Sequence, residues 1–259
     1  MKPVMLLDRF YNKYIIKGTL VAETPIHIGA GEESLDPIQT DNSVIKDVNG
    51  KPYIPGSSIK GALRSYLETL LLSGVDQRFK ACLIVNDPCL GDEDEVEKIK
   101  RIYQEEKRDR DLDLIVAEEI YRNLCDVCRI FGNPYFASKL KVDDCMLKGD
   151  AHLSIRDGVG IDRDTGTAAD GKKYDFEQVD AGAQFEFCMS VDNLEPEHEE
   201  LLKLMVKVLE SGQLRVGGKT SVGLGCIRLI DTRAYKIEPT NFRSYLMEGL
   251  KEEMRWQYV

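Results

Sequence analysis

Residues 53–70 read YIPGSSIKGALRSYLETL, and this stretch decides how the surrounding chain folds. Pro55 and Gly56 interrupt any incoming strand. The hydroxyl of Ser57 or Ser58 can then cap the free amides of a first helical turn. Apolar residues recur at helical spacing from there, namely Ile59, Leu63, Tyr66, Leu67 and Leu70. The sequence therefore predicts a helix that begins at the serines.

Two cations lie near the start of this helix. Lys60 and Arg64 are four residues apart, so they share one helix face. The first amides of a helix have no partner within it, and the helix dipole is positive at that end. Amides and cations together predict a phosphate-binding site.

The totals indicate a globular protein without a membrane span. The chain has 259 residues, of which 42% are hydrophobic, enough for a substantial core. No apolar run reaches membrane-spanning length, and the opening MKPVMLLDRFYNKY is charged too early for a secretory signal. We expect a single domain over residues 1–259, located in the cytoplasm and not bound to a membrane.

The net charge of −10 argues at first against nucleic acid as a partner. Residues 86–126, however, carry fourteen acidic and seven basic side chains, and so contribute −7 of that total. The remainder is close to neutral. The acidity therefore belongs to one segment, predicted as a helical insert over about 75–128, and the rest can still present a basic groove.

Four of the seven cysteines frame this insert: Cys82, Cys89, Cys125 and Cys128. A CxxC pair with two further cysteines across a long loop is typical of a structural zinc site. The alternative is a set of four small buried hydrophobic residues. A redox CxxC ranks below both, because no thioredoxin-like βαβ pattern surrounds it.

Later segments repeat the order of strand and helix. Residues 184–192, QFEFCMSVD, alternate as a strand does, and residues 196–210 follow as an amphipathic helix that ends before Gly212. The segment LRVGGKTSVGLGCIRLID then combines glycines that permit close backbone approach with Lys219, which can supply charge. It lacks the order of a P-loop, so a nucleotide cofactor is not indicated.

Two loops carry the remaining signals. Residues 154–181 are long, polar and rich in glycine, which predicts a protruding hairpin; a surface excursion without regular structure is the alternative. The earlier loop, residues 31–50, holds the candidate carboxylates Asp36, Asp41 and Asp47. His27 just before it is interpreted as a structural histidine at the end of a first strand, rather than a general base.

The order of elements predicts an α+β fold, a ferredoxin-like βαββαβ plait expanded by insertions. The chain also resembles the RAMP superfamily of CRISPR-associated proteins, specifically the backbone subunit of type III RNA-guided effector complexes. The resemblance runs from about residue 14 to residue 231. Five motifs carry it in order: IHIGAGE, TDNSVIKDVNGKPYIPGSSIKGALRS, CRIFGNPYFASKLKVDDC, GIDRDTGTAADGKKYDFEQVDAGAQFEF and LRVGGKTSVGLGCIRL.

The resemblance implies an RRM-like fold that forms a filament of copies along a guide RNA, together with other type III subunits. The hairpin would be a thumb inserted into the guide–target duplex, with Gly160, Ile161, Asp162 and Arg163 in it. Guide backbone contacts are implied for Gly56, Ser57, Ser58, Lys60, Arg64, Gly217, Gly218 and Lys219.

The resemblance also implies cleavage of the target RNA. Asp41, in DNSVIKD, matches the essential aspartate of the cleaving members. The implied reaction is a transesterification supported by Mg²⁺ or Mn²⁺, in which the target's own 2′-hydroxyl attacks the adjacent phosphate.

Three other readings remain open. A non-cleaving backbone subunit would have the same fold and RNA-binding face. A free-standing processing endonuclease would use histidine chemistry, but His27, His152 and His198 are widely spaced and form no recognisable catalytic pair in the sequence. A zinc-stabilised scaffold that binds only protein would contain no nucleic acid.

Overall fold

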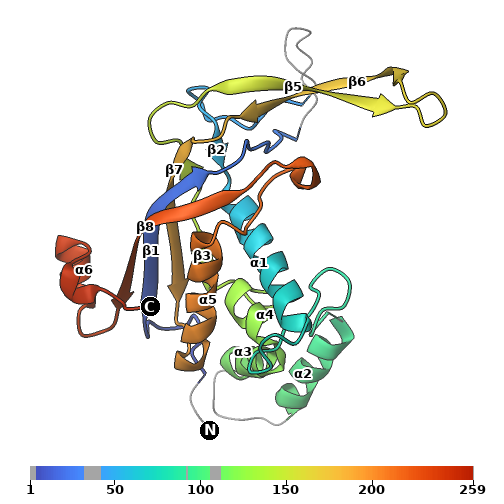
Figure 1. Ribbon diagram of the computed structural model, residues 1–259. Coiled ribbons are helices and arrows are strands. Elements are labelled where there is room, and N and C mark those ends of the chain that lie inside the picture. The colour runs from blue at the N-terminus through green and yellow to red at the C-terminus, as the bar shows by residue number, and fades with distance from the viewer. Residues whose placement is uncertain (1–3, 32–41, 92, 106–111, 259) are drawn as a thin grey trace.

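The computed structural model describes residues 4–31, 42–91, 93–105 and 112–258 (Figure 1). Its main sheet has four strands in the order β3-β7-β1-β8, and every neighbouring pair is antiparallel. The strands are β1 (Lys13–Ala22), β3 (Leu140–Val142), β7 (Gln184–Asp192) and β8 (Ile227–Ile237). The chain is a mixed α/β protein built on antiparallel sheets.

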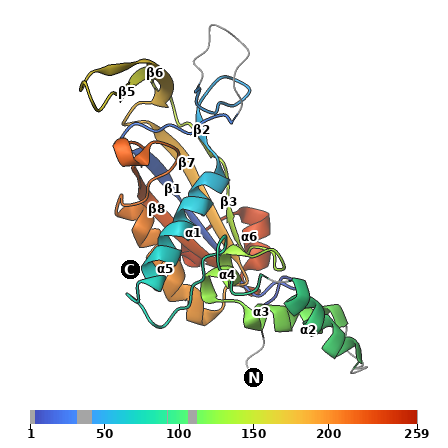
Figure 2. The same ribbon diagram turned by 90° about the vertical axis from the view of Figure 1, so that its right-hand side faces the viewer.

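Two long helices cover one face of this sheet (Figure 2). They are α1 (Gly56–Leu72) and α5 (Glu199–Glu210), which follows the short 3-10 helix η1 (Pro196–His198). Every second residue of β7 faces the helices and is buried, which is why its sequence alternates. The apolar stripe of α1 is buried against the same core, at Ile59, Leu63, Leu67 and Leu71.

The start of α1 differs from the serine cap that the sequence predicts. The helix begins at Gly56, Pro55 occupies the N-cap position, and no side chain of that residue caps the helix. The backbone N–H of Gly56 instead donates to Oδ1 of Asp144, 2.8 Å away. A Cβ on Gly56 would lie 2.1 Å from the carbonyl oxygen of Val142, so only glycine allows this close approach. The cap comes from a distant loop, which the local sequence could not reveal.

The other face of the sheet is partly covered by the end of the chain. Ile15, Tyr235 and Ile237 form a second, smaller core there with Met254. The helix α6 (Phe242–Glu248) and the 3-10 helix η3 (Glu252–Met254) supply this cover. The C-terminal tail, for which the sequence indicated no role, therefore shields part of the sheet.

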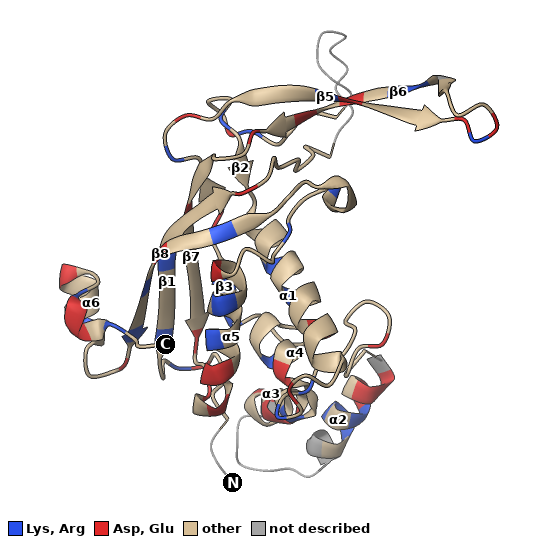
Figure 3. Cartoon of the chain, in the orientation of Figure 1, with Lys and Arg blue, Asp and Glu red and all other residues tan. Residues whose placement is uncertain are grey.

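The described residues of the segment predicted as an insert form three helices at one end of the molecule (Figure 1). They are α2 (Glu93–Glu105), α3 (Leu112–Asn123) and α4 (Asp126–Phe131). Acidic and basic residues are interspersed along α2 (Figure 3). Among the described residues, no helix combines the length and apolarity needed to cross a lipid bilayer.

A two-stranded hairpin projects from the opposite end. It pairs β5 (Leu153–Ile161) with β6 (Ala168–Val179) in a sheet of their own (Figure 1). Gly160 and Ile161 end β5, and Asp162 and Arg163 begin the turn. Oδ1 of Asp162 accepts from the amides of the next turn residues. A third small sheet joins β2 (Tyr53–Ile54) to β4 (Cys145–Met146) beside the start of α1.

Candidate metal centre and nucleic-acid interface

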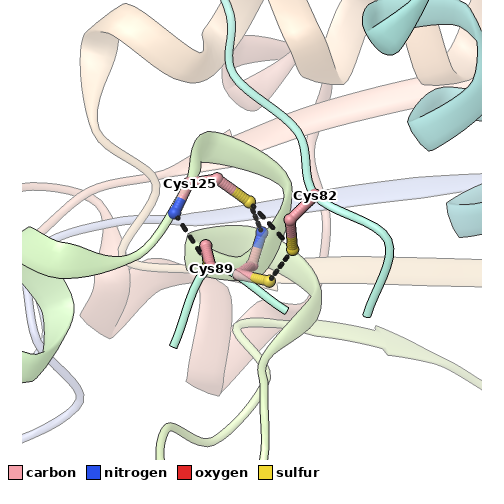
Figure 4. A group of neighbouring side chains, drawn as sticks. Cys82, Cys89 and Cys125 are labelled. Atoms are coloured by element: carbon pink, nitrogen blue, oxygen red, sulfur yellow. Dashed lines mark hydrogen bonds between the residues drawn. The ribbon is translucent and has the colours of Figure 1, made fainter. Parts of the chain in front are cut away.

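The four cysteines that frame the insert come together, and Figure 4 shows Cys82, Cys89 and Cys125 of this group. The Sγ atoms of Cys82, Cys89, Cys125 and Cys128 all lie within 4.8 Å of one another. Cys82 Sγ is 3.5 Å from Cys128 Sγ and 3.7 Å from Cys125 Sγ. Four sulfurs about 2.3 Å from a tetrahedral zinc are about 3.8 Å apart, so the observed spacing fits such an ion. The cluster could hold a metal ion.

Local backbone geometry explains how the CxxC pair is presented. Cys125 is the N-cap of α4, so its side chain turns back over the first turn, where the amide of Cys128 donates to its Sγ at 3.5 Å. The amide of Cys125 donates in turn to Sγ of Cys89 at 3.3 Å. Amide donors of this kind stabilise thiolates. The chain carrying Cys82 is tied to α4 by the bond from the Asp126 amide to the carbonyl of Lys80.

The thiols of the cluster differ in acidity. A side-chain hydrogen bond with Cys128 lowers the pKa of Cys125 to about 5, against the opposing effect of burial. Burial raises the pKa of Cys82 to about 12. All seven cysteines are free thiols. A cation would replace the shared protons and let several sulfurs ionise together.

Arg64 also reaches this cluster. Its Nη2 donates to Sγ of Cys128 at 3.1 Å, its Nε to Oε1 of Glu68 at 2.7 Å, and its Nη1 to the carbonyl of Gly132 at 2.8 Å. The Arg64 side chain is only 15% exposed. Burial disfavours its charge, but the bonds to Glu68 and Cys128 outweigh that and raise its pKa. The guanidinium therefore points into the protein.

Lys60 lies one turn earlier and is half-buried. Its Nζ donates to Oγ of Ser138 at 2.7 Å, and burial lowers its pKa, with a smaller contribution from Arg64. Ser57 is exposed, whereas the amide of Ser58 donates to the carbonyl of Pro55. A phosphate at this end of α1 would meet the exposed Ser57, but it would compete with Asp144 for the Gly56 amide.

The glycine-rich loop packs against the hairpin. Gly217 has φ +81°, and a Cβ there would lie 2.3 Å from the carbonyl oxygen of His27, which also accepts from the amide of Gly218 at 2.8 Å. Nζ of Lys219 lies 4.6 Å from the ring centre of Tyr174 and 4.5 Å from that of Phe176, both on β6. The loop and the hairpin therefore share one contact region.

The loop that carries the candidate carboxylates returns to this same region. Asp36 and Asp41 lie outside the described residues. Asp47 accepts from the amides of Asn49 and Lys51 through Oδ1, as a turn-forming aspartate does. The carbonyl of Asn42 accepts from the amide of Glu177 on β6 at 3.0 Å. Asn42 therefore lies beside the base of the hairpin.

The three histidines have different hydrogen-bond partners. His27 is buried, and its Nδ1 lies 2.7 Å from the carbonyl oxygen of Glu177, which fits a structural role. His152 pairs with Asp180 on the exposed base of the hairpin, with Nδ1 2.8 Å from Oδ2. His198 is 1% exposed, and its Nε2 lies 2.8 Å from Oδ1 of Asp126.

Sequence reasoning missed a buried charge cluster that joins the insert to the sheet. Lys139 is fully buried, and its Nζ donates to Oε2 of Glu195 at 2.9 Å and to the hydroxyl of Tyr121 at 2.8 Å. Glu195 also lies 3.3 Å from Nδ1 of His198. Burial opposes ionisation of Glu195, yet the bonds to His198 and Lys139 lower its pKa to about 2. Nothing in the local pattern around Lys139 distinguishes it from the exposed Lys141 two residues later.

These features define a class of protein: a mixed α/β protein with an antiparallel sheet, a projecting hairpin and a four-cysteine cluster in a helical segment. The chain matches the RAMP superfamily over residues 19–228, and it belongs to that superfamily.

Two relatives of known identity are similar to this chain. The CRISPR system Cms endoribonuclease Csm3 of Methanocaldococcus jannaschii is 29% identical over 236 residues, which cover 85% of this chain and 80% of that protein. The protein of the same name from Methanothermobacter thermautotrophicus is 49% identical over 61 residues, or 23% of this chain and 25% of that protein. The resemblance stated from the motifs is thereby confirmed.

Proposed function

We propose that this protein is the guide-RNA-binding backbone subunit of a type III CRISPR effector complex, and that it cleaves complementary target RNA at regular intervals. The observation that carries the proposal is the similarity to an endoribonuclease Csm3 along 85% of the chain. The contact region shared by the hairpin, the glycine-rich loop and Asn42 supports it, because three separate RAMP motifs meet there.

The proposed architecture is a ferredoxin-like plait in which β1, α1, β3, β7, α5 and β8 form the βαββαβ unit. The strand order β3-β7-β1-β8, with antiparallel neighbours, supports this topology. The insert over about 75–128 and the thumb over about 154–181 are additions to one domain. Copies of the subunit would associate along the guide in the cytoplasm, with other type III subunits at the ends.

The proposed guide contacts are to the phosphate backbone. They come from the start of α1 and from the glycine-rich loop, namely Gly56, Ser57, Ser58, Lys60, Gly217, Gly218 and Lys219. Hydroxyls, amides and cations of this kind position a strand without reading its bases. The thumb would separate base pairs of the guide–target duplex and bring one target nucleotide into line for cleavage.

Cleavage would proceed by attack of a target 2′-hydroxyl on the adjacent phosphorus. The 2′-oxygen loses its proton, the P–O5′ bond breaks, and the leaving 5′-oxygen gains a proton, which gives a 2′,3′-cyclic phosphate and a 5′-hydroxyl end. Asp41 would act as the base or hold the divalent ion, and Mg²⁺ or Mn²⁺ would supply charge neutralisation at the phosphate. The alternative, a non-cleaving backbone subunit, differs in this step alone.

We further propose that the cysteine cluster binds a structural zinc ion. The four sulfurs have the spacing for tetrahedral coordination, and the CxxC amides are already directed at sulfur. Such an ion would hold the loop segment with Cys82 and Cys89 against α4, and would have no part in cleavage.

The substitution Asp41→Ala tests the cleavage step. We expect the reconstituted complex to lose divalent-metal-dependent cutting of a complementary RNA and to retain assembly and target binding, measured by gel cleavage and gel shift on one preparation. The Asp47→Ala complex is the matched control, because Asp47 shapes a turn. Undiminished cutting by the Asp41→Ala complex would contradict the assignment, and loss of assembly would indicate a turn-forming role instead.

A further inference from the structure

Arg64 belongs to the resembling motif on α1, but its contacts are with the metal centre. Two of its three hydrogen bonds go to the segment that carries the CxxC pair: one to Sγ of Cys128 at 3.1 Å and one to the carbonyl of Gly132 at 2.8 Å. Gly132 is the C-cap of α4, and its amide donates to the carbonyl of Cys128. The guanidinium therefore holds both the sulfur and the end of the helix that presents it.

The third hydrogen bond fixes the direction of the guanidinium. Nε of Arg64 donates to Oε1 of Glu68, one turn further along α1, at 2.7 Å. Glu68 is buried, at 7% exposure. Because a guanidinium is planar and rigid, anchoring Nε leaves Nη1 and Nη2 aimed across to α4. The arrangement is built on two helices and does not depend on a mobile surface side chain.

The charge of a loaded metal centre explains why a cation is needed there. Four thiolates and one Zn²⁺ carry a net charge of −2, and a buried charge is costly unless it is paired and hydrogen-bonded. An N–H donor from an always-charged guanidinium to one sulfur lowers that cost. Residues of this kind around a metal centre typically change its metal affinity about 10- to 100-fold.

We propose that Arg64 is a positioning residue of the metal centre, which donates to the Cys128 thiolate and thereby ties α1 to the bound metal. This inference rests on the proposed zinc site. It deepens that proposal, because the helix that Arg64 ties down also carries Lys60, whose Nζ donates to Oγ of Ser138, and that hydroxyl lies 2.7 Å from the carbonyl oxygen of Leu140 and 3.3 Å from that of Ile130 on α4. Metal loading would therefore steady the start of the proposed guide-binding helix.

Metal affinity of the full-length protein tests the inference. Zn²⁺ is titrated against a chromophoric chelator, and Co²⁺ is used to record the sulfur-to-metal charge-transfer band. Arg64→Gln should bind both metals at least 10-fold more weakly than the unaltered chain and shift that band. Arg64→Lys keeps the positive charge but loses the forked guanidinium. Its metal affinity should lie between those of Arg64→Gln and the unaltered chain. Lys203→Gln is the control, because it removes a cation whose Nζ donates to Glu200 on α5, and its metal affinity should not change.

Three outcomes would overturn the inference in distinguishable ways. Equal metal affinity of Arg64→Gln and the unaltered chain would show that Arg64 does not support the metal. Loss of guide RNA from Arg64→Gln with metal retained would return it to the phosphate-binding set. Failure of the unaltered chain to bind metal would remove the zinc proposal itself, while its RNA content would still report on the proposed function.

A second variant covers the case in which Arg64→Gln does not fold. Glu68→Met leaves the guanidinium in place but removes the oxygen that accepts from its Nε. Weaker metal binding by Glu68→Met would then support the inference, and unchanged binding would overturn it.

Discussion

Arg64 and Lys219 are both cations of the RAMP motifs, yet they lie in opposite surroundings. Arg64 is enclosed at the insert end, between a carboxylate, a carbonyl and a thiol. Lys219 lies at the hairpin end over the rings of Tyr174 and Phe176, and Tyr174 is 48% exposed. A buried ion network must be complete to be stable, whereas Lys219 is only half-buried. The same kind of residue is therefore enclosed by hydrogen bonds at one end, whereas at the other end we propose that it meets a ligand.

Removal of the proposed zinc ion should have the largest effect, and that effect should be greatest at the insert end. Cys125→Ser combined with Cys128→Ser removes two thiolates, and structural zinc contributes on the order of 10 kcal/mol in small metal-dependent folds. We expect α3 and α4 to lose hydrogen-exchange protection while β1 and β7 keep theirs.

Cys226→Ser is the control for this prediction, because Cys226 lies outside the cluster and bonds the carbonyl of Gly212. Its metal content and its exchange pattern should match those of the unaltered chain. A metal-free preparation of the unaltered chain with undiminished thermal stability would refute the structural role of the metal.

The close packing at the hairpin end is tested most directly by a substitution at Gly217. Alanine there would have φ +81° and a Cβ 2.3 Å from the His27 carbonyl oxygen, which is backbone and cannot move aside. We expect Gly217→Ala to lower the free energy of unfolding by about 2–4 kcal/mol. Gly223→Ala is the matched control: its φ is +98° but nothing lies within 4 Å of the added carbon, so it should cost about 1 kcal/mol. Equal losses in chemical denaturation would contradict the close-packing argument.

The insert end should also respond to pH through His198. Burial opposes its charge, but the bonds to Asp126 and Glu195 prevail and raise the pKa of His198 in the folded state. The resulting stabilisation is complete below the unfolded pKa of about 6.5 and is lost as the pH rises through the higher folded value. Unfolding free energies between pH 6 and 9 should fall accordingly, and His198→Gln should flatten that decline. The same slope in both proteins would count against the charged histidine.

Much of the architecture follows from local patterns in the sequence. The alternation in 184–192 and the helical spacing in 53–70 and 196–210 indicate β7, α1 and α5 because each presents one apolar face to a common core. The clustering of the four cysteines was also predictable, because four thiols that frame an insert can together bind a metal ion. These signals are local or compositional.

The partners of the charged groups could not be predicted in the same way. The cap of α1 comes from Asp144, 88 residues away in the chain. Lys139 is buried because Glu195, 56 residues later, neutralises it. Arg64 likewise bonds to groups of the α4 segment that are distant from it in the sequence. A spacing of four residues places two cations on one helix face, but the fold determines whether that face meets solvent or another element.

The smallest expected effect concerns Lys219. It separates two roles of this residue, namely contact with the aromatic rings of β6 and neutralisation of a guide phosphate. A cation over aromatic rings contributes about 0.5–2 kcal/mol, so Lys219→Met should reduce exchange protection of β6 slightly without unfolding the sheet. If Lys219 also neutralises one guide phosphate, the slope of log affinity against log salt should fall by about 0.7–0.9 in Lys219→Met. Lys219→Arg keeps both interactions and is the control. A reduced salt slope with unchanged β6 protection would assign Lys219 to RNA alone. Reduced protection with an unchanged slope would make it, like Arg64, a structural cation, and the contrast between the two ends would disappear.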